Sequence, residues 1–179
     1  MPNGTGFRGE LLGPQLTDGL TNDHKTPFDI DELPEGSLYL ADIGFFAIQR
    51  LCNIARCKDK QNGKRGKRYF VSRLQPHTNL YNRRGHLINL KGILPKLVGQ
   101  VCEVGAVLGQ KNGVPVRLIT LRVPGSAWQK NGHSRIRETA QDHGRVPTEE
   151  LLELAHWTIV ITNVSRKRAS YEEILVLLT

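Results

Sequence analysis

The sequence has few of the features that mark a secreted, zinc-binding or membrane protein. Its three cysteines, Cys52, Cys57 and Cys102, are an odd set without metal-ligand spacing, and none of its six histidines comes near such spacing. The longest uninterrupted apolar run, 174–178, is far too short to cross a bilayer. The chain does not open with a basic stretch followed by an apolar one. These absences predict reduced cysteines in a cytoplasmic protein.

What the sequence holds in excess is positive charge. The 179 residues include 25 Lys and Arg against 17 Asp and Glu, which gives a formal net charge of +8. This excess points to a polyanionic partner, with nucleic acid as the first expectation and an anionic membrane surface as the second. With 39% hydrophobic and 23% charged residues, the chain suits one globular domain, with or without an inserted subdomain.

A strand, a carboxylate and a helix follow one another early in the chain. Apolar residues at 37–41 come after turn formers and predict a buried strand that ends at Asp42. Gly44 allows a sharp turn, and from Phe45 onward the apolar spacing predicts an amphipathic helix that packs on the sheet. A carboxylate at this end of a strand lies where open α/β sheets place their chemistry. The alternative is an aspartate that caps the helix.

A basic segment, 58–68, comes next. Six of its eleven residues are basic: Lys58, Lys60, Lys64, Arg65, Lys67 and Arg68. Such a run is either a solvated loop or a loop that contacts phosphates without reading base sequence. A strand is expected at 69–74, and Arg73 near its end could make an ordinary salt bridge.

The middle of the chain has a β-like pattern. Alternating apolar residues at 101–108 and 116–123 flank the turn 109–113, which predicts a β-hairpin. Proline cannot donate a ladder hydrogen bond, so Pro115 predicts that the returning strand lies at an edge of the sheet.

The remaining residues predict two helices, a strand and a last helix. The helices are expected over 126–143 and around 151–155, and the strand over 157–164. The last helix is expected to begin at Ser170, because Ser170 and Glu173 have the spacing of a capping box. That role accounts for Glu173 without catalysis.

Four stretches resemble, in the same order, motifs of the DDE transposases of bacterial insertion sequences. The first is Ala-Asp-Ile-Gly-Phe-Phe at 41–46, which is similar to the second-aspartate motif of that family. The others are 68–74, 157–164 and 170–175, and the resemblance covers most of the chain from about residue 6 onward.

The resemblance implies an α/β fold with a partial RNase H-like core that is interrupted by a β-rich insertion. On this basis we expect the partial core, with the second aspartate, over 1–74 and the insertion, with helices, over 75–156. The return strand and the start of the helix that leads to the catalytic glutamate are expected over 157–179.

The resemblance also implies metal-dependent cutting and joining of DNA, that is, DNA transposition. Asp42 would be a catalytic and metal-ligating residue, with Mg²⁺ or Mn²⁺ as the cofactor of the complete enzyme. The implied partner is double-stranded DNA at transposon ends, with a homodimer in the complete enzyme and a nucleoid-associated place in the bacterial cytoplasm. The expected DNA-binding residues are Lys58, Lys60, Lys64, Arg65, Lys67, Arg68 and Arg73.

Two carboxylates of the family pattern have no assigned position in this sequence. In the family the first aspartate lies on an earlier strand, further upstream than Asp18 or Asp23, and the glutamate lies in a Tyr…Arg…Glu…Lys pattern that would fall beyond Thr179. We therefore expect a segment truncated at both ends, which binds DNA but neither holds a metal stably nor acts alone. A non-enzymatic nucleic-acid-binding module and an inert remnant stay open as alternatives.

Overall fold

The computed structural model describes residues 33–56, 68–75, 77–110, 113–124, 146 and 148–178. Its strands form one six-stranded mixed sheet in the order β1-β2-β6-β5-β4-β3. The strands are β1 (Leu38–Ala41), β2 (Tyr69–Arg73), β3 (Leu80–Tyr81), β4 (Val101–Leu108), β5 (Val114–Arg122) and β6 (Trp157–Thr162). The helices are η3 (Ile43–Phe45, a 3₁₀ turn), α1 (Ile48–Arg56), α2 (Leu90–Ile93), α4 (Glu149–Leu154) and α5 (Tyr171–Val176). The expected α/β class is thereby confirmed.

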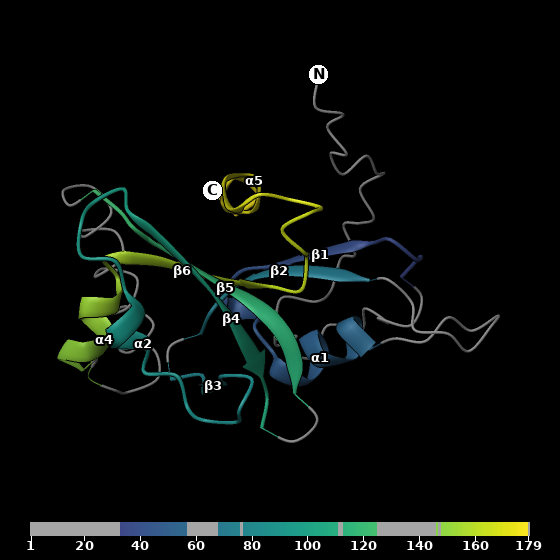
Figure 1. Ribbon diagram of the computed structural model, residues 1–179, viewed down its shortest axis with the longest axis horizontal. Helices are drawn as coiled ribbons and strands as arrows, with labels where there is room; N and C mark the ends of the chain where they lie inside the picture. The colour runs from purple at the N-terminus through teal and green to yellow at the C-terminus, as the bar shows by residue number, and fades with distance from the viewer. Residues whose placement is uncertain are drawn as a thin grey trace.

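Helices cover both faces of the sheet, with α1 on one face and α5 on the other (Figure 1). Strands β2 and β5 carry buried apolar side chains on both faces, and successive side chains of a strand point to opposite faces. In β2, Phe70 packs in the core on the α1 side, and Val71 packs in the core on the α5 side. In β5, Leu118 packs in the core on the α1 side, and Ile119 packs in the core on the α5 side. This explains why these strands read as continuous apolar runs.

The first two strands are parallel and the other neighbours are antiparallel. A parallel pair needs a crossover connection, and α1 lies in the chain between β1 and β2. The register pairs Ala41 with Ser72, so the residues that follow, Asp42 and Arg73, lie side by side at the carboxyl end of β1. The expected strands at 37–41 and 69–74 are both confirmed to within one residue.

The first helix begins later than the sequence predicts. Ile43–Phe45 form a 3₁₀ turn, in which the amide of Phe45 donates to the carbonyl of Asp42 at 3.0 Å. The α-helix then starts at Ile48, not at Phe45. The apolar spacing was correct for the buried face, but it does not distinguish the tighter turn from the first turn of the helix.

The hairpin is confirmed, but the position expected for its second strand is wrong. Strand β5 lies inside the sheet, between β4 and β6. Its pairing with β6 begins only at Arg117, opposite Thr162, so Pro115 lies beyond the end of β6 and pairs with Val107 of β4 alone. The missing N–H of the proline therefore breaks no hydrogen bond to β6. Pro115 itself therefore has a strand neighbour on one side only, as the proline rule requires, although β5 as a whole is not an edge strand.

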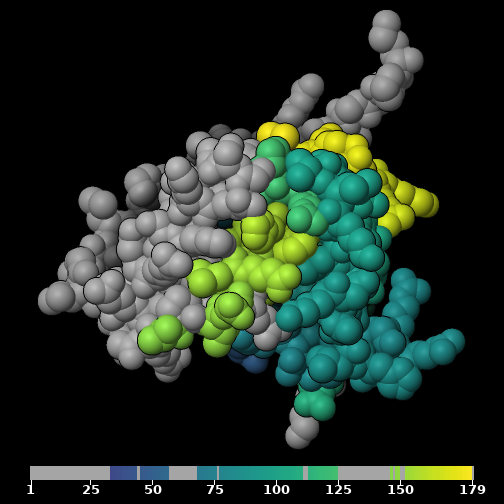
Figure 2. Space-filling view, turned by 90° about the vertical axis from the view of Figure 1, so that its left-hand side faces the viewer, coloured from purple at the N-terminus to yellow at the C-terminus, as the bar shows by residue number. Residues whose placement is uncertain are grey.

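The two short helices α2 and α4 lie together at one end of the sheet, the end that faces the viewer in Figure 2. Lys91 of α2 and Glu153 of α4 form an ion pair at 3.9 Å, and the indole N–H of Trp157 donates to the carbonyl of Pro95 at 2.9 Å. The short helix expected around 151–155 is thus confirmed as α4.

Three further expectations concern the end of β6, the helix predicted over 126–143 and the state of the cysteines. Strand β6 ends at Thr162, two residues before the expected 164. The helix expected over 126–143 falls outside the described residues. Cys52 and Cys102 are free thiols, as expected, and Cys57 is not among the described residues.

No helix in the described part of the chain is both long and apolar enough to cross a membrane.

Candidate functional site

Asp42 stands where the sequence places it, directly after β1, with Arg73 of β2 beside it. The Nε atom of Arg73 lies 3.4 Å from a carboxylate oxygen of Asp42. The Asp42 side chain is 62% exposed and that of Arg73 is 20% exposed. A carboxylate so placed is open to solvent ligands such as a hydrated divalent cation.

The alternative role of Asp42, as a helix cap, is not what the structure contains. Asp42 occupies the N-cap position of η3, but its side chain makes no capping hydrogen bond. The carboxylate therefore faces Arg73 rather than the amides of the turn. Because Arg73 also donates from Nη2 to the carbonyl of Leu178 at 2.9 Å, one guanidinium links Asp42 to the residues that follow α5.

Among the residues that the structure describes, Asp42 and Arg73 bring one carboxylate and one guanidinium to this place. The carboxylate can give a divalent cation one charged oxygen ligand, and the guanidinium can donate two hydrogen bonds to a phosphate. In the described ranges, no group of three or more His, Cys, Asp or Glu side chains could hold a metal ion. Asp18 and Asp23 lie outside those ranges.

The basic segment is described only at its carboxyl end. The carbonyl of Arg68 accepts a hydrogen bond from the Asn163 side-chain amide at 2.9 Å, and the Asn163 oxygen accepts the amide of Phe70 at 2.8 Å. Asn163 thus holds the start of β2 against the end of β6. The other expected DNA-binding residues of the segment lie outside the described residues: Lys58, Lys60, Lys64, Arg65 and Lys67.

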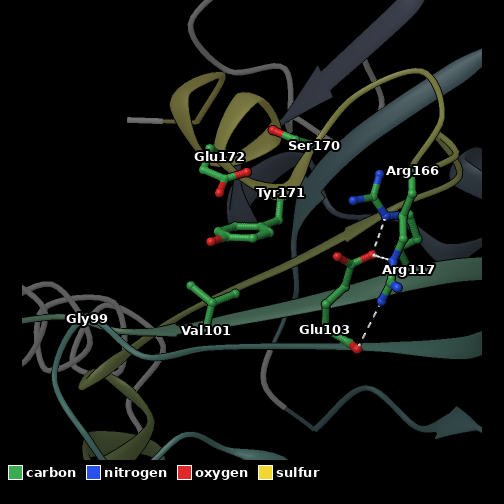
Figure 3. Close-up of a pocket in the computed structure, with 8 residues that line it drawn as sticks. All are labelled: Gly99, Val101, Glu103, Arg117, Arg166, Ser170, Tyr171 and Glu172. Carbon is green, nitrogen blue, oxygen red and sulfur yellow. Dashed lines mark hydrogen bonds and ion pairs between the residues drawn. The ribbon is translucent and has the colours of Figure 1, made fainter.

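A charged cluster that the sequence did not reveal lies on the α5 face of the sheet (Figure 3). One carboxylate oxygen of Glu103 accepts from Nε of Arg117 at 2.6 Å and from Nε of Arg166 at 2.7 Å. The side chains of Glu103 and Arg117 are each only 11% exposed, whereas that of Arg166 is 68% exposed. Burial alone would raise the pKa of Glu103, but the hydrogen bonds and charges of the two arginines outweigh it and lower that pKa.

The register of the hairpin explains this cluster. Glu103 pairs with Ile119, and Arg117 pairs with Gly105, so the two charged residues are diagonal neighbours on one face of β4 and β5. The strands themselves were predictable from alternation. The diagonal contact was not, because it depends on the register, which the turn length sets.

A hollow of about 520 Å³ lies beside the cluster, between the β4–β5 surface and the start of α5 (Figure 3). Its remaining lining includes Val101, Tyr171 and Glu172. A hydrogen bond with Glu172 raises the pKa of Tyr171 and lowers that of Glu172. Asp42 does not line this hollow, so the hollow and the candidate catalytic carboxylate are separate places on the molecule.

The fold thus brings Asp42 and Arg73 together as neighbours at the carboxyl end of β2. Arg68, the last residue of the basic segment, is held by Asn163 at the opposite, amino end of β2. No protein-family model, curated protein or solved structure matches this chain.

Proposed function

We propose that this chain is part of a DNA transposase that cuts and joins DNA by metal-dependent phosphoryl transfer. The observation that carries the proposal is the position of Asp42, solvent-accessible at the carboxyl end of a strand and next to the guanidinium of Arg73. Open α/β sheets place ligands at this end of their strands. The four ordered sequence motifs supply the reaction class.

The chemistry needs carboxylates because they would hold two divalent cations, and these would supply activation of the nucleophile and stabilisation of the leaving oxygen. Asp42 would supply one charged oxygen ligand for Mg²⁺ or Mn²⁺. Arg73 would hold Asp42 in place when no cation is bound and could contact a phosphate oxygen of DNA. The other two carboxylates have no assigned position in this sequence.

The fold is compatible with this proposal. A parallel strand pair with α1 between its members is an α/β connection and would belong to the proposed RNase H-like core, and β3, β4 and β5 would be the β-rich insertion. All six strands belong to one sheet. The proposed insertion would therefore extend the sheet of the core through β6 rather than form a separate barrel or sandwich.

The proposed partner is the phosphate backbone of duplex DNA at transposon ends. The net charge of +8 favours a polyanion, and the basic residues of 58–68 suit contacts that position DNA without reading its sequence. Homodimer formation in the complete enzyme and association with the bacterial nucleoid belong to the same proposal.

One observation favours a second candidate, a nucleic-acid-binding module without catalysis. A transposase site needs three carboxylates, and only one of them, Asp42, has an assigned position in this sequence. The excess of positive charge, in contrast, is sufficient for binding nucleic acid. Both candidates require duplex DNA binding, and they differ in the role of Asp42.

A salt titration of DNA binding tests what the two candidates share. Fluorescence anisotropy with a labelled duplex, at roughly 50 to 200 mM salt, gives the slope of log affinity against log salt concentration. The double variant K64Q/R65Q should reduce the steepness of this slope by about 2 units, since each lost phosphate contact removes about 0.9. The matched control is R83Q/R84Q, which neutralises two exposed arginines in the turn after β3, at the opposite edge of the sheet.

Equal slopes for wild type and K64Q/R65Q would reject the basic segment as a phosphate contact. A wild-type chain that fails to bind duplex DNA even at the lowest salt concentration would reject duplex DNA as the partner, on which both candidates as stated depend.

A further inference from the structure

A second basic feature, the turn 165–168 between β6 and α5, lies outside the segment that the sequence singled out. Arg166, Lys167 and Arg168 are consecutive in it, and every residue of the turn is exposed. Three adjacent cations on one exposed turn repel one another, so a turn of this kind is stabilised by an anion. The question is whether the protein itself supplies that anion in full.

Hydrogen bonds from the backbone and from Arg117 fix the conformation of the turn. The amides of Arg168 and Ala169 both donate to the carbonyl of Ser165, at 3.0 and 3.1 Å. The Nη1 atom of Arg117 donates to the carbonyls of Val164 and Ala169, at 3.1 and 2.8 Å, and so joins the two ends of the turn. Val164 and Ala169 are buried in the core on the α5 side. A ligand would therefore meet a preformed turn, and little ordering would oppose its binding.

Internal acids neutralise the turn only in part. Glu103 shares one oxygen between Arg117 and Arg166, so a single negative charge serves two guanidinium groups. Glu173, on the helix that follows, accepts the amide of Ser170 instead. Lys167 makes no ion pair with any residue in the described ranges. Arg166 and Lys167 together thus keep positive charge available to a ligand.

Arg168 brings the turn next to the end of the basic segment. Its guanidinium carbon lies 4.5 Å from the ring centre of Tyr69, which follows Arg68 directly. This contact holds the guanidinium over the ring face while the positive charge remains. Asn163, two residues before the turn, binds the carbonyl of Arg68 at the same place. Arg68, the last residue of the basic segment, and the turn therefore meet at the junction of β2 and β6.

We propose that Arg68, Arg166, Lys167 and Arg168 form one surface, the β2–β6 basic surface, that binds the phosphate backbone of duplex DNA. The inference rests on the proposed function for its partner and adds the turn as a contact. The contacts would be to phosphates and not to bases, because base edges are read by a helix or a two-stranded ribbon that enters the major groove, and this surface offers only a short turn.

The test is a salt titration of duplex binding by the variant K167Q/R168Q. If both side chains contact phosphates, the slope of log affinity against log salt should fall by about 1.8 units. The loss should be equal for duplexes of unrelated sequence. The charge-preserving variant K167R/R168K should keep the wild-type slope, and R83Q/R84Q again serves as the control at the far edge of the sheet.

The outcomes separate this inference from the proposed function. If wild type and the K64Q/R65Q variant behave as proposed but K167Q/R168Q keeps the full slope, the turn is no contact and this inference alone is overturned. If K167Q/R168Q instead loses binding to vesicles that contain phosphatidylserine and keeps its DNA slope, the surface serves a membrane, which also overturns it. Circular dichroism melting of each variant establishes that the fold is intact, and a folded K167Q/R168Q with the reduced slope supports the proposal.

Discussion

The carboxylate of Glu103 and the guanidinium of Arg117 lie 2.6 Å apart on neighbouring strands, and each side chain is only 11% exposed. Through its Nη1 atom the same guanidinium binds both ends of the turn before α5. The pair therefore joins the β4–β5 hairpin to the last helix. In the described part of the chain, the Nη2 atom of Arg117 is buried without a hydrogen-bond partner, so its charge depends on Glu103 for compensation.

Replacing Glu103 with glutamine should destabilise the protein strongly. The substitution leaves the positive charge of Arg117 buried without an opposite charge, and removal of one partner from a buried pair costs about 3 kcal/mol or more. Urea denaturation gives the free energy of unfolding. The matched control is Lys91→Gln, because the Lys91–Glu153 pair is exposed, with side chains 55% and 60% accessible, and should contribute little. Similar losses for the two variants would contradict this account.

The contribution of Glu103 should also depend on pH. The pKa of this carboxyl is lowered in the folded protein, so its stabilising effect is complete above the ordinary value of 4.5 and is lost as the pH falls through the folded value. The difference in unfolding free energy between wild type and Glu103→Gln should therefore be constant near neutral pH and shrink below about pH 4.5. If the difference in unfolding free energy instead grows as the pH falls, the pKa of Glu103 is not lowered in the folded protein.

Thr162 offers a test of the junction between β2 and β6. Its fully buried hydroxyl donates to the carbonyl of Phe70 at 2.6 Å and accepts the amide of Val164 at 3.0 Å. Thr162→Val keeps the shape but leaves both backbone groups without that partner, which should cost about 2 kcal/mol of unfolding free energy. Thr162→Ser retains the hydroxyl and should cost less. The interpretation fails if the valine variant is the more stable of the two.

The capping box of α5 can be tested separately. The hydroxyl of Ser170 accepts the amide of Glu173 at 3.2 Å, and the carboxylate of Glu173 accepts the amide of Ser170 at 2.8 Å. Ser170→Ala should lower the unfolding free energy by about 1 kcal/mol, whereas Ser170→Gly should lower it by only a few tenths, since glycine suits the cap position. Equal stability of wild type and the alanine variant would show that the cap contributes nothing.

The sequence predicts the local elements well because their patterns are local. Apolar runs between turn formers located β1, β2 and β6, and the spacing of Ser170 and Glu173 located the start of α5. The start of α1 was misplaced because a 3₁₀ turn and an α-helical turn have similar residue preferences. Each of these outcomes depends on residues that are close in the chain.

Relationships between distant residues were harder to predict. The hairpin was expected, yet the position of β5 inside the sheet follows from its pairing with β6, which begins only at Trp157. The contact between Asp42 and Arg73 needs the parallel register of β1 and β2, which no local pattern contains. For the same reason, the Glu103 cluster and the meeting of Arg168 with Tyr69 became apparent only in the folded chain.

The role of Asp42 is the claim that separates a transposase segment from a simple binding module. A lone aspartate gives a divalent ion one charged ligand, so the ion stays mostly hydrated and neither the nucleophile nor the leaving oxygen is fixed. Positioning and charge stabilisation supply most of the catalysis in phosphoryl transfer, so the rate enhancement should be nearly lost.

The most direct test is a plasmid-nicking assay of the 179-residue chain and its Asp42→Asn variant, with Mg²⁺ or Mn²⁺ and with DNA binding measured in parallel. The account predicts that both chains bind the plasmid and that neither nicks it. It further predicts that, in a longer protein that supplies the family's other two carboxylates, activity appears and Asp42→Asn abolishes it while the fold stays intact. Metal-dependent nicking by the 179-residue chain that survives Asp42→Asn would contradict the account, because the metal site would then lie elsewhere.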